Sequence, residues 1–183
     1  ILSGLKTERV AASQVLQGPP MTFTGSKAAL VEAARAALYA SKIISYAQGM
    51  SLLRAAAETY GWGLEYAAIV RVWRAGCIIR ADLLNEIAAA FERQPALSHL
   101  LLDDAFVRLL SDTQAGWRAV VKTGAELGIP LLAVAAALGY FDALRSDRLP
   151  ANLIQAQRDF FGAHTYHRID QDGVFHTDWT ATT

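Results

Sequence analysis

SKAALVEAARAALYASKIISYAQGMSLLRAAAETYG, residues 26–61, is a run without proline in which apolar side chains recur at helical spacing. Ser26 is a residue type that caps helix N-termini, and Gly61 is one that ends helices. A continuous helix between them would be about 50 Å long at about 1.5 Å per residue. Because its apolar residues surround most of its circumference, we expect other helices to pack round it.

The segments on either side of this run also favour helices. Before it, Gly18-Pro19-Pro20 ends a first helical segment, because proline lacks an amide hydrogen and fixes φ. After it, further helices are expected at 65–73, 81–92, 103–127 and 130–145, with one more from about Pro150. Asp103 or Asp104 can cap the third of these, Gly128 can close it, and Pro130 suits the first turn of the next.

Alternation with period two, which is typical of strands, is confined to the end of the chain. In YHRIDQDGVFHTDW, residues 166–179, Asp172-Gly173 could turn a small hairpin or lie in an extended tail. No repeat, low-complexity linker or internal domain boundary is visible. The sequence therefore predicts one all-α domain over residues 1–183, a multi-helix domain built round one long central helix, with a short extended or hairpin C-terminal tail at 167–183.

The composition narrows the classes of function. Seventeen basic and seventeen acidic residues cancel, so no overall positive field attracts nucleic acid or an anionic membrane. A signal-peptide pattern and an uncharged apolar run of about eighteen residues are both absent, so we expect neither secretion nor a membrane span. The single cysteine, Cys77, fits a reducing compartment and hence a cytoplasmic protein. Its apolar surroundings favour a small buried side chain over a nucleophile.

The N-terminus favours a longer parent protein. The chain begins without an initiator methionine, and Leu2, Leu5, Ala12 and Leu16 already recur at about helical spacing. We therefore expect the sequence to start inside a helix and to be a piece of a longer polypeptide.

Common motifs for nucleotides, hydrolysis and metals are absent. The sequence contains neither GxGxxG nor GxxxxGK[ST], the glycine-rich loops that hold nucleotide phosphates. It also lacks GxSxG and HExxH. His164 and His167 are spaced as H-x-x-H, but no third ligand lies at a persuasive distance and Gly162 is expected to end the helix first. No metal site is assigned.

A polar stripe crosses the long apolar run. Ser41, Ser45 and Gln48 recur about one helical turn apart, with Gly49 beside them. One interpretation is hydrogen bonding between helices, with a close approach at Gly49. The other is that the stripe forms a wall of a polar cavity.

Three arginines in the segment after the long run leave a similar choice open. Arg71, Arg74 and Arg80 could gather an anion, because guanidinium offers a planar fork of donors to phosphate or carboxylate. They could equally bind helix C-terminal carbonyls and neighbouring acids.

LPANLIQAQRDFFGAHTY, residues 149–166, differs from the alanine-rich segments before it because it combines amides, aromatics, an arginine and a histidine. On a helix from about residue 151, Gln155 would lie near Arg158. Arg158 and His164 are separated by about 600° of rotation, so they lie on different faces while the helix continues. If Gly162 takes a left-handed φ and ends the helix, His164 folds back beside Arg158. The pair would then form a phosphate site. The structural alternative is a surface helix end with scattered polar groups.

Four segments, YASKIISYAQGM, VWRAGCIIR, LPANLIQAQRDFFGAHTY and FHTDW, resemble in their order and separation the C-terminal all-helical domain of 6-phosphogluconate dehydrogenase. That family is the decarboxylating enzyme of the pentose phosphate pathway. LSGLKTERVAAS at the start is also similar to it, so the resemblance covers essentially the whole chain. It implies that Arg158 and His164 bind the phosphate of 6-phosphogluconate, in the active site of the other subunit of a homodimer.

The resemblance also implies an enzyme larger than this chain. Members of the family oxidise the C3 hydroxyl of 6-phosphogluconate with NADP, lose CO2 and release ribulose 5-phosphate. Their Rossmann domain, lysine general base and glutamate general acid would lie upstream of Ile1. No catalytic or cofactor-binding residue is therefore assigned, NADP is expected to be bound mainly by that absent domain, and the chain alone should be inactive. The family's HTNW reads His176-Thr177-Asp178-Trp179 here.

Two functions remain as alternatives. In the first, the chain is the substrate-binding and dimerisation domain of an NADP-dependent dehydrogenase, whose partner is a second copy and not nucleic acid or a membrane. In the second, it is a non-catalytic helical dimerisation module with no small-molecule ligand of its own. An interface between identical subunits is compatible with both.

Overall fold

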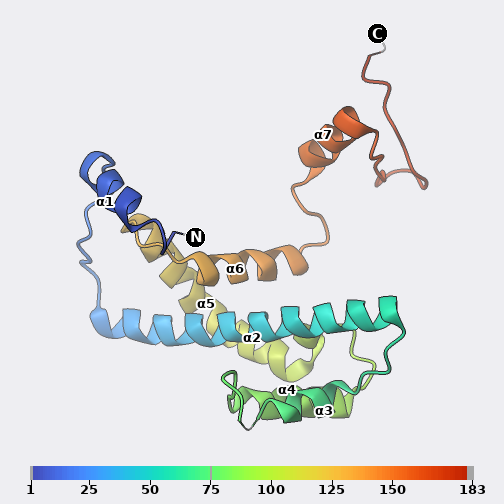
Figure 1. Ribbon diagram of the computed structural model, residues 1–183, viewed down its shortest axis with the longest axis horizontal. Coiled ribbons are helices and arrows are strands. Elements are labelled where there is room, and N and C mark those ends of the chain that lie inside the picture. The colour runs from blue at the N-terminus through green and yellow to red at the C-terminus, as the bar shows by residue number, and fades with distance from the viewer. Residues whose placement is uncertain (1, 75, 181–183) are drawn as a thin grey trace. The chain divides into compact units, whose positions relative to one another are not determined.

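The computed structural model describes residues 2–74 and 76–180. In these residues it contains seven α-helices and one 3-10 helix. Figure 1 labels the α-helices along the chain. They are α1 (Lys6–Val15), α2 (Lys27–Tyr60), α3 (Tyr66–Val72), α4 (Leu83–Arg93), η1 (Leu100–Leu102), α5 (Asp104–Glu126), α6 (Leu132–Leu144) and α7 (Asn152–Gly162). The prediction of an all-α fold built round one long helix is confirmed, because α2 runs unbroken for 34 residues.

Helix α2 begins and ends where its capping residues predict. Ser26 Oγ accepts a hydrogen bond from the amide of Ala29 at 3.3 Å. At the other end, Gly61 takes a left-handed φ of 69°, which glycine adopts without steric cost. The two caps satisfy helix-end backbone groups that have no partner within the helix.

Of two other predicted helix starts, the one at α5 is confirmed and the one at α6 is wrong. Asp103 caps α5, because its Oδ1 accepts from the amide of Ala105 at 3.0 Å. Pro130 was expected in the first turn of the next helix, but α6 begins only at Leu132. Gly128 has a φ of 67°, so the chain turns after α5, and residues 129–131 have no regular secondary structure before the next helix begins.

The chain divides into two compact units, Ile1–Phe141 and Asp142–Thr183. The first unit holds an apolar core drawn from α2 to α6. Its largest fully buried apolar side chains are Trp117, Phe106, Ile43, Ile44, Leu84, Ile87, Leu100 and Val70. Burial of such side chains is the main favourable term in folding, so this core accounts for the stability of the first unit.

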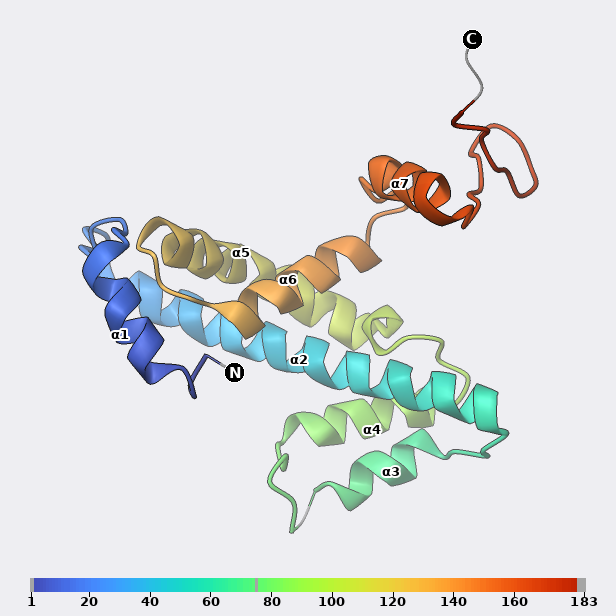
Figure 2. The ribbon, with the colours of Figure 1, turned by 45° about the horizontal axis from the view of Figure 1, so that its top comes forward.

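Helices α2 and α5 form the main packing contact of the first unit, and α3 packs against α4 (Figure 2). Gly116 of α5 faces Ala33 and Ala36 of α2, and a Cβ at position 116 would lie 3.1 Å from the Cβ of Ala36. The next residue, Trp117, donates its indole N–H to the carbonyl of Val134 in α6 at 3.1 Å. One turn of α5 therefore joins three helices.

The second unit contains α7 and the segment after it. The expected tail, 167–183, belongs to this unit, and its last three residues lie outside the described part of the chain. Tyr166 and Phe175 form an antiparallel bridge, with each amide donating to the other's carbonyl at 2.9 Å. Gly173, at φ 122°, lies in the turn between them. The tail therefore folds as a small hairpin, one of the two forms that the sequence allows.

Candidate functional site

The end of α7 positions the predicted phosphate ligands. The prediction that Gly162 leaves the helix with a left-handed φ is wrong, because Gly162 is the last helical residue. Ala163 and Thr165 take left-handed conformations instead, with φ of 48° and 60°. The amide of Ala163 donates to the carbonyl of Asp159 at 2.9 Å and closes the last turn.

Arg158 and His164 line the same hollow, of about 350 Å³. Its other lining residues are Ile154, Gln157, Phe161 and Gly162. The side chains of Arg158 and His164 are both exposed. Among the described residues, neither side chain has a hydrogen-bond or ion-pair partner, so their donors are available to a ligand. The sequence argument that a helix end would bring these two groups together agrees with this placement.

Gln155 does not join Arg158 in this hollow. It lines a different one of about 310 Å³, with Asn152, Tyr166 and Thr177 among its neighbours. The i, i+3 spacing correctly places Gln155 one turn before Arg158, but the hollows fall on separate sides of the helix. Gln157, which the sequence analysis did not single out, lies beside Arg158 instead.

Gly162 has a different role from the predicted one. A Cβ at position 162 would lie 3.3 Å from Cδ2 and 3.4 Å from Nε2 of His164. Such separations are tighter than ordinary van der Waals contact, so the imidazole rests over the glycine because no side chain is there. The glycine makes room for His164 and does not supply the turn.

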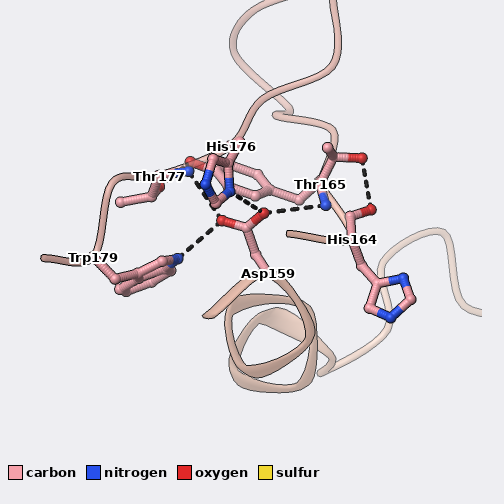
Figure 3. A network of polar contacts seen from close by, with 7 residues as sticks. Asp159, His164, Thr165, His176, Thr177 and Trp179 are labelled. Atoms are coloured by element: carbon pink, nitrogen blue, oxygen red, sulfur yellow. Dashed lines mark hydrogen bonds and ion pairs between the residues drawn. The ribbon is translucent and has the colours of Figure 1, made fainter. Parts of the chain in front are cut away.

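A buried acid lies behind this site. Asp159 is fully buried and is the only buried residue of α7. Its Oδ1 accepts hydrogen bonds from the amide of Thr165 at 3.1 Å and from Nδ1 of His176 at 2.9 Å. Its Oδ2 accepts from the amide of Thr177 and from the indole N–H of Trp179, both at 2.9 Å. Figure 3 shows these donors converging on one carboxylate.

This environment keeps Asp159 ionised. Burial by itself would raise the pKa of the carboxyl. Hydrogen bonds from Thr177, His176 and Trp179, together with the charge on His176, outweigh burial and lower the pKa from 3.8 to about 2. A carboxylate accepts hydrogen bonds and cannot donate them, which suits a site with donors on every side.

The sequence analysis missed Asp159. Its partners in the tail are 17 to 20 positions away along the chain, so helical spacing does not reveal them. The available signal was an acid in the middle of an otherwise polar and aromatic helix segment, followed by the donor-rich HTDW. A search for donors to pair with that acid would have pointed to His176 and Trp179.

Part of the polar stripe of α2 faces a cavity, because Ser45 and Gly49 line it whereas Ser41 and Gln48 do not. Lys42, Ser45, Tyr46 and Gly49 line a pocket of about 440 Å³, with Trp73, Ile78, Ile79 and Arg80 on its other side. No atom would come within 4 Å of a Cβ on Gly49, so the close helix approach expected there is wrong. The cavity interpretation fits the structure better.

The three arginines after α2 do not gather. Arg71 forms an ion pair with Glu92, in line with the structural interpretation. Arg80 lines the pocket beside α2, whereas Arg74 lies elsewhere on the surface. Cys77, expected to be buried, is only partly so, because residues 76–82 are not helical and the segment stays near the surface.

Comparison with known proteins identifies the family. Residues 1–179 match the family described as 6-phosphogluconate dehydrogenase, C-terminal domain. This chain belongs to that family. A relative from Rattus norvegicus, named 6-phosphogluconate dehydrogenase, decarboxylating, is 55% identical over 181 residues, which are 98% of this chain and 38% of the relative. The Escherichia coli (strain K12) protein of the same name is 52% identical over 178 residues, 97% of this chain and 38% of that protein.

A solved structure from the same family has the same fold. Plasmodium falciparum 6-phosphogluconate dehydrogenase, described in its apo form and in complexes with NADP+ and 6-phosphogluconate, superposes with a TM-score of 0.86 at 37% identity. The match covers 97% of this chain and 38% of that one. The resemblance inferred from four sequence segments is therefore confirmed. The chain spans about 38% of the length of the relatives named here.

Two further findings concern metals and membranes. Within residues 2–74 and 76–180, no group of three or more His, Cys, Asp or Glu side chains is arranged to hold a metal ion. In the same residues, no helix combines the length and apolar character that crossing a bilayer requires.

Proposed function

We propose that this chain is the substrate-binding and dimerisation domain of an NADP-dependent 6-phosphogluconate dehydrogenase. The whole enzyme would oxidise and decarboxylate 6-phosphogluconate to ribulose 5-phosphate, CO2 and NADPH, as a step of the pentose phosphate pathway. The observation that carries this proposal is that Arg158 and His164 line one hollow at the end of α7. The names of the rat and Plasmodium relatives support the choice of substrate and cofactor.

The chemistry of the hollow suits a phosphate ester. Arg158 offers a planar fork of donors whose charge does not depend on pH in the physiological range, and such a fork binds two phosphate oxygens at once. His164 adds a ring nitrogen that can donate a further hydrogen bond. Ile154 and Phe161 supply apolar walls. These walls strengthen the electrostatic interaction, because they exclude water from one side of the anion.

Cofactor binding requires residues beyond this chain. The sequence has no glycine-rich dinucleotide loop, so NADP would be held mainly by another part of the enzyme. When bound, that cofactor accepts the hydride. The residues of this chain contribute by holding the phosphate end of the substrate, which orients its carbon chain. No catalytic residue is assigned to this chain.

The second unit is suited to bind another copy of the chain. Leu153 is 77% exposed and Phe161 is 78% exposed, and Ile154 and Phe160 are also largely open to solvent. Single apolar residues on a surface are common, but α7 buries only an acid and leaves these four apolar side chains largely exposed together. We propose that a second subunit covers it, with Arg158 and His164 completing the partner's site.

Substitution of Arg158 tests the phosphate site. In the full-length enzyme, Arg158→Ala should raise the KM for 6-phosphogluconate, with a loss of roughly 2 to 5 kcal/mol in binding free energy if the ion pair is desolvated in the complex. Arg145→Ala is the control, because Arg145 pairs with Asp142 at 3.0 Å and lies outside the hollow. An unchanged KM for Arg158→Ala would refute the assignment.

Mixed dimers test whether the site is shared. A subunit with Arg158→Ala and a subunit lacking the upstream catalytic lysine should each be inactive alone. Mixed together, some heterodimers would combine one intact lysine with one intact Arg158 across the interface. Recovery of activity is expected, and its absence would exclude sharing between subunits.

The exposed apolar helix face also favours a second candidate, a helical dimerisation module with no small-molecule ligand. Under this alternative the chain associates through α7, but Arg158→Ala leaves substrate binding intact in the full-length enzyme. Sedimentation of the chain over a range of concentrations tests association. A strict monomer at all concentrations would exclude the module, whereas a dimer with an unaffected Arg158→Ala variant would favour it over the phosphate site.

We also propose a cytoplasmic protein without nucleic-acid or membrane partners. The balanced charge and the single cysteine support this location. A relative from Oryza sativa, 53% identical, is named chloroplastic, so members of the family occur in more than one compartment. Cell fractionation decides the question, and recovery of the protein with organelles or membranes would contradict the proposal.

A further inference from the structure

The turn that carries His164 is held by a carboxylate. Asp159 follows Arg158 directly in α7, and its side chain is wholly buried. Its Oδ1 accepts a hydrogen bond from the amide of Thr165, the residue directly after His164, at 3.1 Å. In Figure 3 this bond lies just beside the backbone of His164, while the imidazole points away from the carboxylate.

The backbone on both sides of His164 needs such support. Ala163 and Thr165 both have left-handed φ values, which residues other than glycine rarely adopt. Conformations of this kind persist only where the surrounding structure determines them. Asp159 holds both positions, because its carbonyl accepts from the amide of Ala163 at 2.9 Å and its carboxylate accepts from Thr165.

The same carboxylate also holds the tail. It accepts hydrogen bonds from His176, Thr177 and Trp179, all at 2.9 Å. The hairpin bridge between Tyr166 and Phe175 leads the chain back to this point. One buried acid therefore links the helix, the turn with His164, and the segment 176–179.

We propose that Asp159 is a positioning residue for the phosphate site: its buried carboxylate fastens the turn 163–165 and the segment 176–179 to α7, and so fixes His164 beside Arg158. This inference rests on the proposed function, because the role it assigns is toward the same phosphate site. Asp159 itself does not line the hollow and does not touch the ligand.

An amide in place of the carboxylate would fail for a definite reason. Each carboxylate oxygen faces two donors. In Asp159→Asn, one oxygen becomes an NH2 group, which cannot accept. With the NH2 at the Oδ2 position, the amide of Thr177 and the indole N–H of Trp179 both lose their acceptor. With the NH2 at the Oδ1 position, the amide of Thr165 loses its acceptor, while Nδ1 of His176 can accept from the NH2 in its other tautomer. Buried donors without partners are costly, so the turn or the tail is expected to move away from α7.

The first experiment uses the full-length enzyme. Asp159→Asn should raise both the KM for 6-phosphogluconate and the inhibition constant of inorganic phosphate, roughly 10- to 100-fold, as expected when a binding group is displaced by about an ångström. Asp172→Asn is the control, because it removes one exposed acid from the hairpin turn and should change neither constant. Unchanged constants in Asp159→Asn, with Arg158→Ala impaired, would overturn the positioning role.

A double-mutant cycle separates positioning from general damage to the fold. If Asp159 acts through His164, then Asp159→Asn should change these constants by less than about twofold when His164→Ala is already present, within the scatter of additive effects. The same large loss in both backgrounds would mean that Asp159 only supports the fold, and the proposal would be wrong.

A milder variant keeps the test valid if Asp159→Asn does not fold. Trp179→Phe removes one donor to Oδ2 but keeps a ring to pack edge-on against Phe160. Trp179→Phe should raise the inhibition constant of inorganic phosphate, but by less than Asp159→Asn does. This effect should again vanish in the His164→Ala background. An unchanged inhibition constant in a folded Trp179→Phe enzyme would count against the positioning role of Asp159. If Arg158→Ala and His164→Ala both leave phosphate binding unchanged, the proposed phosphate site itself is wrong, and this inference falls with it.

Discussion

The two units of this chain are each stabilised internally by a different kind of buried side chain. In Ile1–Phe141, the buried side chains are almost all apolar and come from helices α2 to α6. In Asp142–Thr183, the helix α7 buries a single side chain, and it is a carboxylate. Aromatic and aliphatic side chains that would form a core in the first unit, such as Leu153 and Phe161, are exposed in the second.

This difference explains what each unit can do. An apolar core gives stability in proportion to the surface it buries, without regard to direction. Hydrogen bonds to a buried acid are directional, and they fix a turn and a tail in one geometry. The second unit therefore has a fixed backbone geometry around the proposed phosphate site, while apolar side chains such as Leu153 and Phe161 remain exposed.

The largest effect should come from truncating the core of the first unit. Trp117→Ala should lower the free energy of unfolding by about 3 to 5 kcal/mol, because it leaves a cavity between α5, α2 and α6 and removes the hydrogen bond to Val134. Denaturant unfolding of the chain, followed by circular dichroism, measures this change. Trp62→Ala is the control, since Trp62 is 51% exposed. Equal losses in the two variants would contradict the picture of a core in which Trp117 is a central buried residue.

The sequence predicts the first unit well because its determinants are local. Helical spacing of apolar residues, the cap at Ser26 and the left-handed Gly61 are each readable within a few residues. The errors fall where local signals compete. Pro130 was predicted to lie inside a helix that starts two residues later. A close approach between helices was considered at Gly49, but it occurs at Gly116. Which glycine meets a neighbouring helix depends on packing, which spacing alone does not determine.

In the second unit, the sequence predicts that Arg158 and His164 lie close together, but it does not show what holds them there. The rotation per residue shows that Arg158 and His164 can meet only if the helix ends, and both line one hollow. The left-handed residue at the helix end was assigned to Gly162, because glycine adopts that conformation at little cost, and this assignment was wrong. Ala163 and Thr165 take that conformation instead. They are supported by Asp159, whose partners in the tail are too distant in sequence to be recognised from spacing.

Acid should weaken the hold of Asp159 on the tail. The pKa of Asp159 is lowered from 3.8 to about 2 in the folded chain. A lowered pKa means that ionised Asp159 contributes fully to stability above about pH 4, the value for an unfolded aspartate, and that this contribution is lost as pH falls toward 2. The indole N–H resonance of Trp179 should therefore keep its position at pH 4 and shift between pH 4 and 2.

The ionisable group that faces Asp159 is His176, which donates to Oδ1. In Asp159→Asn the Trp179 resonance should no longer depend on pH in this window. A shift that is complete by pH 4 would show that the carboxylate is not held in its ionised form.

The smallest effect should come from Gly162→Ala, and its two consequences should have opposite signs. Alanine favours a helix over glycine by up to about 1 kcal/mol in the interior and by less at the last turn, so the second unit should become slightly more stable. The new Cβ would lie 3.3 Å from Cδ2 of His164, so the ring must shift by a few tenths of an ångström. Inorganic phosphate should then inhibit the full-length enzyme a few-fold less well, by the sensitivity of bound geometry to small displacements.

Gly139→Ala separates these two consequences. Gly139 lies within α6, and no atom comes within 4 Å of a Cβ built there, so alanine should bring the helix-favouring effect alone. The midpoint temperature of thermal unfolding should rise in both variants. Inhibition by phosphate should weaken only in Gly162→Ala. If Gly162→Ala binds phosphate as well as the unsubstituted enzyme, then the place of His164 over the glycine has no bearing on the ligand. Arg158 alone would then account for the anion site, and the turn that Asp159 holds would serve the tail and not the phosphate.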